Sequence, residues 1–111
     1  MRQITVNNLA ITLDDEGYLL QLADWSAAVA EYLAIEERIQ LTDAHWEIIE
    51  VIRHFYQQYQ LSPAMRPLVK AVTLALGPEK GKSIYLMKLF PESPAKQAAK
   101  LAGLPKPTNC L

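Results

Sequence analysis

The hydrophobic positions of this chain change their spacing near residue 24. Within the first twenty residues, apolar and polar side chains roughly alternate in "RQITV" and "LAITL", and a third short apolar run, "YLLQL", follows the turn-like sequence "DDEG". A spacing of two is typical of strands that bury one face. The pattern therefore predicts a short three-stranded meander, one face of which must be covered by helices.

From Asp24 onward the apolar spacing is that of helices. Asp24 is the predicted N-cap of the first helix, "DWSAAVAEYLAIEE". Thr42 is the predicted N-cap of "LTDAHWEIIEVIRHFYQQYQL", whose apolar stripe is wide enough to occupy the centre of the core. Ser62 favours the start of a third helix over 64–76, and a fourth short helix is expected near 83–89.

The sequence "SPAKQAAKLAG" predicts the last helix, with Ser93 as its N-cap and Gly103 as its stop. The following residues, "LPKPTNCL", show no packing pattern. Pro105 and Pro107 fix φ, favour extended geometry in the residues before them and prevent the helix from continuing. We therefore expect a semi-rigid strut that stands off the domain.

Together these elements predict an α+β fold that is mostly helical. A three-stranded N-terminal meander packs on an array of about five short helices, and an extended, Pro-containing arm follows. We expect one globular domain over 1–102, with strands within 1–22 and helices within 24–102. Residues 103–111 are expected to form a mobile C-terminal arm.

The composition is that of an ordinary globular domain. Half of the 111 residues are hydrophobic and 21% are charged, so the chain can bury a core without disulfides. A single cysteine cannot form an internal disulfide, and "MRQITVNNLA" lacks the apolar segment of a signal peptide, so we expect a reducing cytoplasm. No apolar run approaches the about 18 residues of a membrane span, and we expect no membrane partner.

Charge is distributed unevenly along the chain. Residues 1–60 carry ten acidic and three basic side chains, whereas residues 61–111 carry two acidic and eight basic ones. Such a dipole can steer a negatively charged partner toward the C-terminal half, although a solvated lysine-rich surface would show the same pattern. The candidate docking surface consists of Arg66, Lys70, Lys80, Lys82, Lys88, Lys96 and Lys100.

Several kinds of site are disfavoured. His45 and His54 are nine residues apart on one helix and therefore project from opposite faces, which excludes a helical zinc pair. We expect both histidines at the surface or at its boundary. The sequence "GPEKGKS" lacks the spacing of a phosphate-binding loop and does not follow a predicted strand. We therefore expect neither a metal nor a cofactor.

Cys110 is the strongest chemical candidate, because a cysteine so near the end of the arm is not easily enclosed in a core. The positioning residues are expected to be those of the arm: Gly103, Leu104, Pro105, Lys106 and Pro107. Seven steps separate Gly103 from Cys110, and at about 3.1 Å per residue they give a reach of roughly 22 Å. A thiol on such a strut could enter a recessed site of another protein, which is the geometry of a carrier.

The stretch "GPEKGKSIYLMKLFPESPAKQAAKLAGLPKPTNCL" resembles the C-terminal signature of the TusE/DsrC sulfur-carrier family, whose members include the gamma subunit of dissimilatory sulfite reductase. The sequences "DEGYL", "HWEIIEVIRHFY" and "SPAMRPLVKA" are similar to the helical core of the same family. The resemblance implies a three-stranded meander on about five helices. It also implies that Cys110 carries sulfur as a persulfide, which makes the chain a sulfurtransferase in the sense of a carrier.

One position distinguishes branches of the family that the chain resembles. Members that serve sulfite reduction or sulfur oxidation carry a second cysteine eleven residues before the penultimate one, where this chain has Ala99. The single cysteine looks like the TusE branch. That branch implies a relay that receives sulfur from a TusBCD-like complex and passes it to the tRNA 2-thiouridylase, with tRNA contacted only through the acceptor.

Two alternatives stay open at this point. A single-cysteine carrier could serve sulfur oxidation or sulfite reductase instead, with sulfite reductase as its partner. The helices on either side of "LSP" also resemble a helix-turn-helix, which would suit a regulatory DNA-binding module. The candidate recognition helix carries only Arg66 and Lys70 as cations, so few side chains are available to contact DNA bases. A monomer is the default expectation for oligomeric state.

Overall fold

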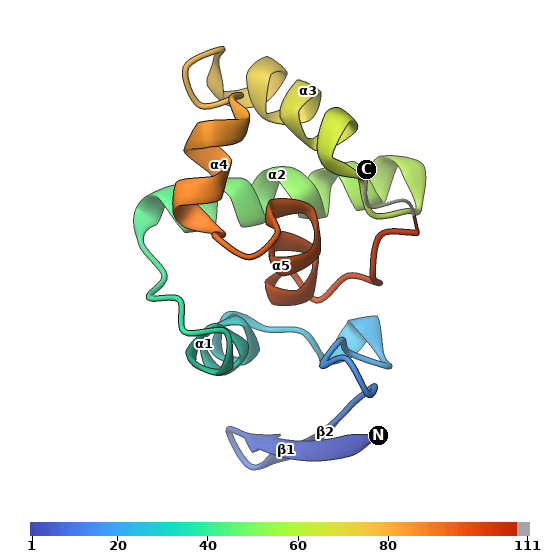
Figure 1. The fold of residues 1–111 in the computed structure, drawn as a ribbon. Coiled ribbons are helices and arrows are strands. Elements are labelled where there is room, and N and C mark those ends of the chain that lie inside the picture. The colour runs from blue at the N-terminus through green and yellow to red at the C-terminus, as the bar shows by residue number, and fades with distance from the viewer. Residues whose placement is uncertain (109–111) are drawn as a thin grey trace.

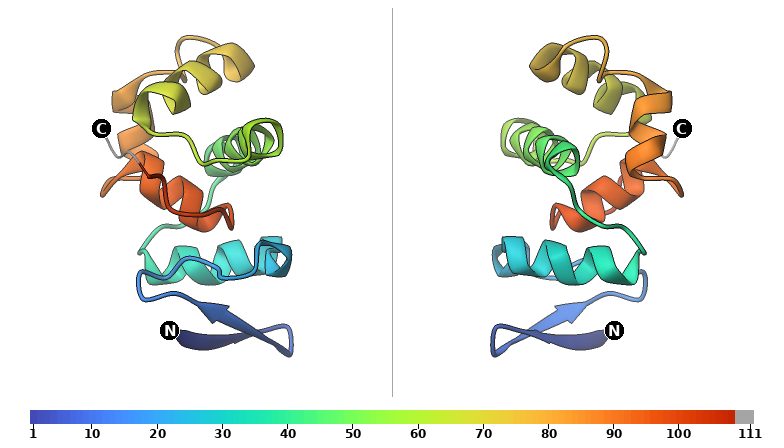
Figure 2. Two further views of the ribbon diagram at one scale, coloured as in Figure 1. Left: turned by 90° about the vertical axis from the view of Figure 1, so that its right-hand side faces the viewer. Right: turned by 90° about the vertical axis from the view of Figure 1, so that its left-hand side faces the viewer.

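The computed structural model describes residues 1–108 and shows a hairpin at one end of an elongated helical molecule (Figure 1). Its dimensions are 40 × 26 × 20 Å. Figure 2 shows that α1 lies between the hairpin and the other four helices. The elements are β1 (Arg2–Val6), β2 (Leu9–Leu13), a short 3-10 helix η1 (Leu22–Asp24), α1 (Ala27–Glu36), α2 (Asp43–Tyr59), α3 (Met65–Leu76), α4 (Ser83–Leu89) and α5 (Pro94–Leu101).

The two strands pair antiparallel through a tight turn. Arg2 lies opposite Leu13 and Val6 opposite Leu9, which leaves Asn7 and Asn8 as the turn. Both asparagines have positive φ, of 51° and 66°, as a two-residue turn with the right twist requires. The buried side chains of the hairpin all lie on one face: Ile4, Val6, Ile11 and Leu13.

The expectation of a third strand is wrong. Of the segment "YLLQL", only Leu19 pairs with the sheet, through an isolated bridge to Leu13. The preceding turn explains why, because the Asp14 carboxylate accepts the N–H groups of Glu16 and Tyr18, each at 2.9 Å, and turns the chain sharply. The chain then enters η1 at residue 22, so the segment is too short to form a ladder. The rest of the predicted class, a mostly helical α+β fold with five α-helices, is confirmed.

The core forms around α2, which packs against both α3 and α5. Ile48, Ile49 and Ile52 of α2 are almost completely buried. They meet fully buried side chains from the later helices and loops: Leu68, Val72, Leu86, Phe90 and Leu101. None of the helices within residues 1–108 is long and apolar enough to cross a membrane.

Two helices begin later than the sequence predicts. The N-cap of α1 is Ser26, whose Oγ accepts the Val29 N–H at 3.2 Å, while Asp24 belongs to η1. The N-cap of α3 is Ala64, and Ser62 does not cap it. The Ser62 hydroxyl is instead engaged by a distant segment of the chain, because its Oγ donates a hydrogen bond to the Pro105 carbonyl.

The two histidines project differently, as their spacing requires, but His45 is not at the surface. Its side chain is buried, and both ring nitrogens have partners. Nδ1 accepts the backbone N–H of Thr42, the N-cap of α2, at 3.1 Å, and Nε2 donates to the Leu89 carbonyl at 2.8 Å. This histidine therefore joins the start of α2 to the end of α4, whereas His54 is exposed.

Candidate functional site

Cys110, the residue that the sequence singles out, lies outside the described residues. The structure instead defines the segment that leads to it, residues 103–108, which we call the arm segment. Cys110 follows Thr108 by two residues in the sequence. The surroundings of the arm segment are therefore the described part of the candidate site.

The arm segment begins at the end of α5, which has a well-defined closure. Its start is also as expected, because the Ser93 side chain accepts the Lys96 N–H. At the other end, Gly103 has a φ of 75° and its N–H bonds the Lys100 carbonyl at 3.1 Å. The Leu104 N–H bonds the Ala99 carbonyl at 2.9 Å. This pair of bonds is a Schellman motif, so the predicted helix stop at Gly103 is confirmed.

Two side chains from other elements hold the last carbonyls of α5. The Trp25 Nε1–H donates to the Leu101 carbonyl at 2.8 Å, and Arg53 Nη1 donates to the Ala102 carbonyl at 2.7 Å. The Arg53 guanidinium also lies 3.8 Å from the centre of the Trp25 ring, at which distance the cation is attracted to the ring face. We call Trp25 and Arg53 the root clamp.

Trp25 also restricts the position where the arm segment starts. A Cβ atom added at Gly103 would lie 2.3 Å from Trp25 Cδ1 and 2.7 Å from Trp25 Cβ. Glycine is therefore required at this position for two reasons, the positive φ and the close approach of the indole.

Beyond Gly103, the arm segment lies against the domain. Leu104 is only 4% exposed and Pro107 is buried. The Ser62 Oγ donates to the Pro105 carbonyl at 2.5 Å, and Lys106 Nζ lies 2.8 Å from the Glu16 carboxylate. In Figure 1 the trace after α5 accordingly runs toward the end of α2.

This course differs from the expected strut that stands off the domain from Gly103. Burying the Leu104 side chain is favourable by roughly 1.5–3 kcal/mol, which a segment projecting into water would forfeit. A reach of roughly 22 Å from Gly103 is open only if these contacts break. The domain boundary at residue 102 and the mobility of 103–111 stay predictions.

The residues of the candidate docking surface do not share one environment. Lys80 pairs with Glu47 at 2.8 Å, and Lys100 pairs with Glu37 at 3.2 Å. The hydrogen bond with Glu47 raises the pKa of Lys80. Lys100 also lies over the Tyr18 ring, 5.1 Å from its centre. These two lysines hold elements together, so they are less available to a partner than the sequence suggests.

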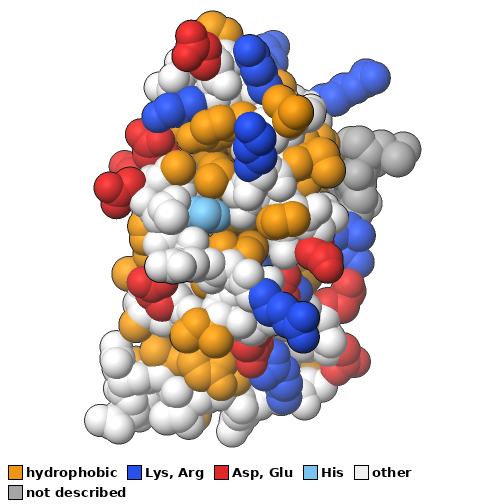
Figure 3. All heavy atoms as spheres, turned by 60° about the vertical axis from the view of Figure 1, so that its left-hand side comes forward, with side chains coloured by type: hydrophobic (Ala, Val, Ile, Leu, Met, Phe, Trp, Pro, Cys, Tyr) orange, Lys and Arg blue, Asp and Glu red, His pale blue; other side chains and the backbone are white. Residues whose placement is uncertain are grey.

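The other cations of the surface are more accessible. Arg66, Lys70, Lys82 and Lys88 are exposed, and Lys96 is half-buried. On the face shown in Figure 3, Lys and Arg side chains lie among exposed hydrophobic ones in the upper part of the molecule. Helix α4 contributes to such a mixture, since Ile84 and Met87 are 67% and 50% exposed beside Lys88. A mixed apolar and basic face suits a protein partner.

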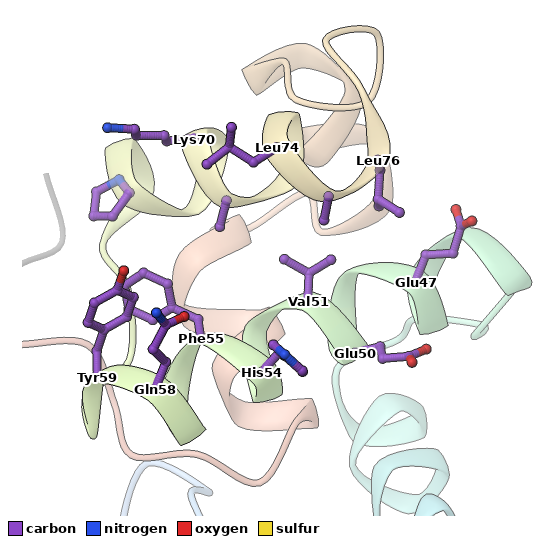
Figure 4. A pocket seen from close by; sticks show the side chains of 13 residues that line it. Glu47, Glu50, Val51, His54, Phe55, Gln58, Tyr59, Lys70, Leu74 and Leu76 are labelled. Carbon is purple, nitrogen blue, oxygen red and sulfur yellow. The ribbon is translucent and has the colours of Figure 1, made fainter.

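A groove of about 670 Å³ opens between α2 and α3. Figure 4 shows Val51 of α2 pointing into it toward α3, with Phe55, Tyr59 and Leu74 farther along its walls. The hydrogen bonds and the ion pair described above for the root clamp and the arm segment involve none of these side chains. Lys70, a residue of the candidate docking surface, lines this groove.

Metal binding has no support in the described part of the chain. Within residues 1–108, no three His, Asp or Glu side chains are grouped closely enough to hold a metal ion. The residues that sequence reasoning missed are those that hold the arm segment and the end of α5 just before it: Glu16, Trp25, Arg53 and Ser62. Each contacts a residue more than forty positions away, so no local pattern could have revealed them.

Comparison with known sequences gives a consistent result over nearly the whole chain. A family described as "DsrC like protein" matches residues 5–111. The "Sulfurtransferase TusE homolog" of Haemophilus influenzae is 54% identical over 97% of this chain and 99% of its own length. The "Sulfurtransferase TusE" of Sodalis glossinidius is 56% identical over 95% of this chain and 97% of its own length.

Solved structures support the same relationship. Allochromatium vinosum DsrC is similar with a TM-score of 0.90 and 50% identity, over 98% of this chain and 97% of that one. The oxidized gamma subunit of dissimilatory sulfite reductase (DsrC) from Archaeoglobus fulgidus has a TM-score of 0.86 and 38% identity, over 99% of this chain and 100% of that one.

Proposed function

Because the chain belongs to the DsrC-like protein family, we propose that it is a sulfurtransferase that works as a relay, with Cys110 as the residue that carries sulfur. The observation that carries the proposal is near-full-length identity above 50% to proteins named sulfurtransferase TusE. Transfer of sulfane sulfur through a protein requires a nucleophilic thiol, and Cys110 is the only cysteine of this chain. No free-standing turnover of a small molecule is expected.

The chemistry balances without an added oxidant or reductant. The Cys110 thiolate attacks the outer sulfur of a donor persulfide, R–S–SH, and forms a new S–S bond. The S–S bond of the donor breaks, and its inner sulfur leaves as the thiolate R–S⁻. Cys110 then holds Cys–S–SH, and the same exchange with an acceptor thiolate regenerates the Cys110 thiolate. Each step is a thiol–disulfide type of exchange, so its rate depends on access and on thiolate character.

The proposal names two protein partners. The donor is a TusBCD-like complex, and the acceptor is the tRNA 2-thiouridylase, so that the sulfur ends in 2-thiouridine and tRNA is contacted only through the acceptor. The mixed basic and apolar surface around α4 would suit docking by a partner with an acidic rim. A relay of this kind needs a reduced thiol, which is why we place it in the cytoplasm.

A second candidate function keeps the chemistry and changes the pathway. The similarity to DsrC structures favours a carrier linked to sulfur oxidation, or one whose partner is sulfite reductase. Carriers of that route that use two cysteines have the second one at the position of Ala99, and this chain lacks it. Ala99 is fully buried and has no thiol, so this chain cannot close an internal bridge to Cys110.

The test replaces Cys110 with serine in a host whose tRNA thiolation depends on this copy. We expect 2-thiouridine in tRNA to be lost, because serine cannot form a persulfide. Thr108→Ala is the matched control, since Thr108 is exposed on the same arm segment and Cys110 is retained. Thiolation that persists undiminished in Cys110→Ser would reject the function.

A further inference from the structure

We infer that Trp25 and Arg53, the root clamp, are positioning residues that set the place and direction at which the C-terminal arm leaves the domain. The inference rests on the proposed function, because it assigns these two side chains to the delivery of Cys110. Neither residue would touch the transferred sulfur. Their effect would pass through the backbone of Leu101 and Ala102 to the residues that follow.

The clamp acts on the groups of α5 that most need partners. The last carbonyls of a helix have no N–H donor within the helix, so their hydrogen-bond partners must come from outside it. The Leu101 and Ala102 carbonyls are consecutive, and they are held from two different elements, by Trp25 after η1 and by Arg53 in the middle of α2. Two bonds on adjacent peptide units restrain the direction of the chain as well as its position.

The environment of Arg53 supports a restraining role. Among residues 1–108, it forms no ion pair with a carboxylate. Burial lowers the pKa of its guanidinium, which still remains charged. The partly desolvated charge is compensated by the Ala102 carbonyl, by the negative end of the α5 dipole and by the face of Trp25. The first two partners belong to the end of α5, where the arm begins, and the third is the other residue of the clamp.

The position that the clamp restrains is also the start of the arm, so a small change there can displace the residues that follow. The Trp25 indole touches Gly103 closely enough that a Cβ there would lie 2.3 Å from Cδ1. Once the contacts of Leu104, Pro105 and Lys106 with the domain break on docking, a rotation of about 10° at the start of an extended segment of roughly 22 Å would move its far end by about 4 Å. Misplacement of a reacting group by about 1 Å can cost on the order of 100-fold in rate. Loss of the clamp should therefore reduce transfer far more than it reduces folding.

The first experiment measures single-turnover sulfur transfer from the persulfidated protein to a saturating thiouridylase acceptor. Arg53→Met removes the charge and the hydrogen bond, Arg53→Lys retains one donor, and Trp25→Phe removes the indole N–H. We expect the maximal rate to fall at least about tenfold for Arg53→Met, with partial rescue by lysine. Alkylation of Cys110 by iodoacetamide, which needs no docking, should change less than about twofold. Arg38→Met, at an exposed arginine, is the matched control.

The second experiment does not depend on sulfur chemistry. A nitroxide is attached to Thr108→Cys in a Cys110→Ser background, and the paramagnetic broadening of backbone amides is recorded by NMR. With the clamp intact, the broadened amides should lie near Glu16 and Ser62, the residues that contact the arm segment. In the Arg53→Met and Trp25→Phe backgrounds, the broadening should spread and weaken.

The outcomes separate the two claims. Failure of the unaltered protein to accept or pass on sulfur would refute the proposed function, and the nitroxide pattern would still decide the positioning role. Normal transfer by folded Arg53→Met would overturn that role alone. The positioning role would also be overturned by a nitroxide broadening pattern that is the same with and without the clamp. The same conclusion would follow if the loss of transfer in each variant were no larger than its fraction of unfolded protein.

Discussion

Replacing Gly103 with alanine perturbs the root of the arm at its most constrained position. The substitution adds one methyl group to a residue whose φ is 75°. Left-handed backbone costs a residue with a side chain about 1–2 kcal/mol, and reduced freedom of the unfolded chain returns about 0.4–1 kcal/mol of this. The backbone effect alone is therefore about 1 kcal/mol.

The close contact with Trp25 adds to that cost. The new Cβ would lie 2.3 Å from Trp25 Cδ1, whereas carbon atoms in good contact are about 3.5–4.0 Å apart. Turning the indole cannot relieve the overlap, because Trp25 Cβ itself would lie only 2.7 Å away. Forcing a methyl group into a packed site costs about 1–3 kcal/mol. The expected total loss in the free energy of unfolding is about 2–4 kcal/mol.

Urea unfolding followed by circular dichroism measures this loss. Gly17→Ala is the matched control, because Gly17 also has a positive φ, of 91°, but a Cβ there would make only ordinary contact, at 3.6 Å, with the flexible Lys100 side chain. We expect Gly103→Ala to cost at least about 1 kcal/mol more than Gly17→Ala, the excess being the overpacking term. Equal losses for the two variants would refute the close packing of Trp25 on the arm root.

Three further predictions concern the same region. Leu104→Ala should lower the free energy of unfolding by about 2–3 kcal/mol in urea, whereas a loss below about 0.5 kcal/mol would show that the arm segment is not packed. Ser62→Ala should cost about 1 kcal/mol through the lost bond to the Pro105 carbonyl, and no change in urea unfolding would mean that this bond is unimportant. In Ala99→Cys, the new thiol should be alkylated only after unfolding, because Ala99 is fully buried; native mass spectrometry showing it as reactive as Cys110 would contradict the packing.

Much of the helical part of the fold was predictable because its signals are local. Ser93, Pro94 and Gly103 mark the ends of α5 by side-chain capping, by a ring suited to the first turn and by positive φ. The range expected for α4 also agrees with the structure. Such signals depend on residues within one turn of each other, and a sequence displays them directly.

The errors arose where a local pattern competes with a distant contact. The segment "YLLQL" has the composition of a strand, but the Tyr18 hydroxyl reaches the Lys96 carbonyl at 3.3 Å and draws the segment toward α5. A histidine is often found at the surface, yet the His45 ring is buried between the N-cap of α2 and the Leu89 carbonyl. Serine is a common N-cap residue, but the Ser62 hydroxyl donates to the Pro105 carbonyl of the arm segment instead.

The same reasoning explains what was found of the candidate site. Cys110 could be singled out as a candidate from its position in the sequence, because a lone thiol beyond two prolines and so near the chain end is not easily enclosed in a core; its role stays a prediction. The residues that hold the approach to it could not, since Trp25 and Arg53 lie 76 and 49 positions from the carbonyls that they bind. Only the folded arrangement brings them together.

Transfer of a sulfur atom to Cys110 is the central claim, and intact-mass spectrometry tests it most directly. The full chain is incubated with a persulfide donor, excess donor is removed, and its mass is compared with that of Cys110→Ser treated in the same way. The account predicts a gain of one sulfur atom per chain that is reversed by a thiol reductant and absent from Cys110→Ser. An unaltered mass in the native protein, or an equal gain in the serine variant, would contradict it.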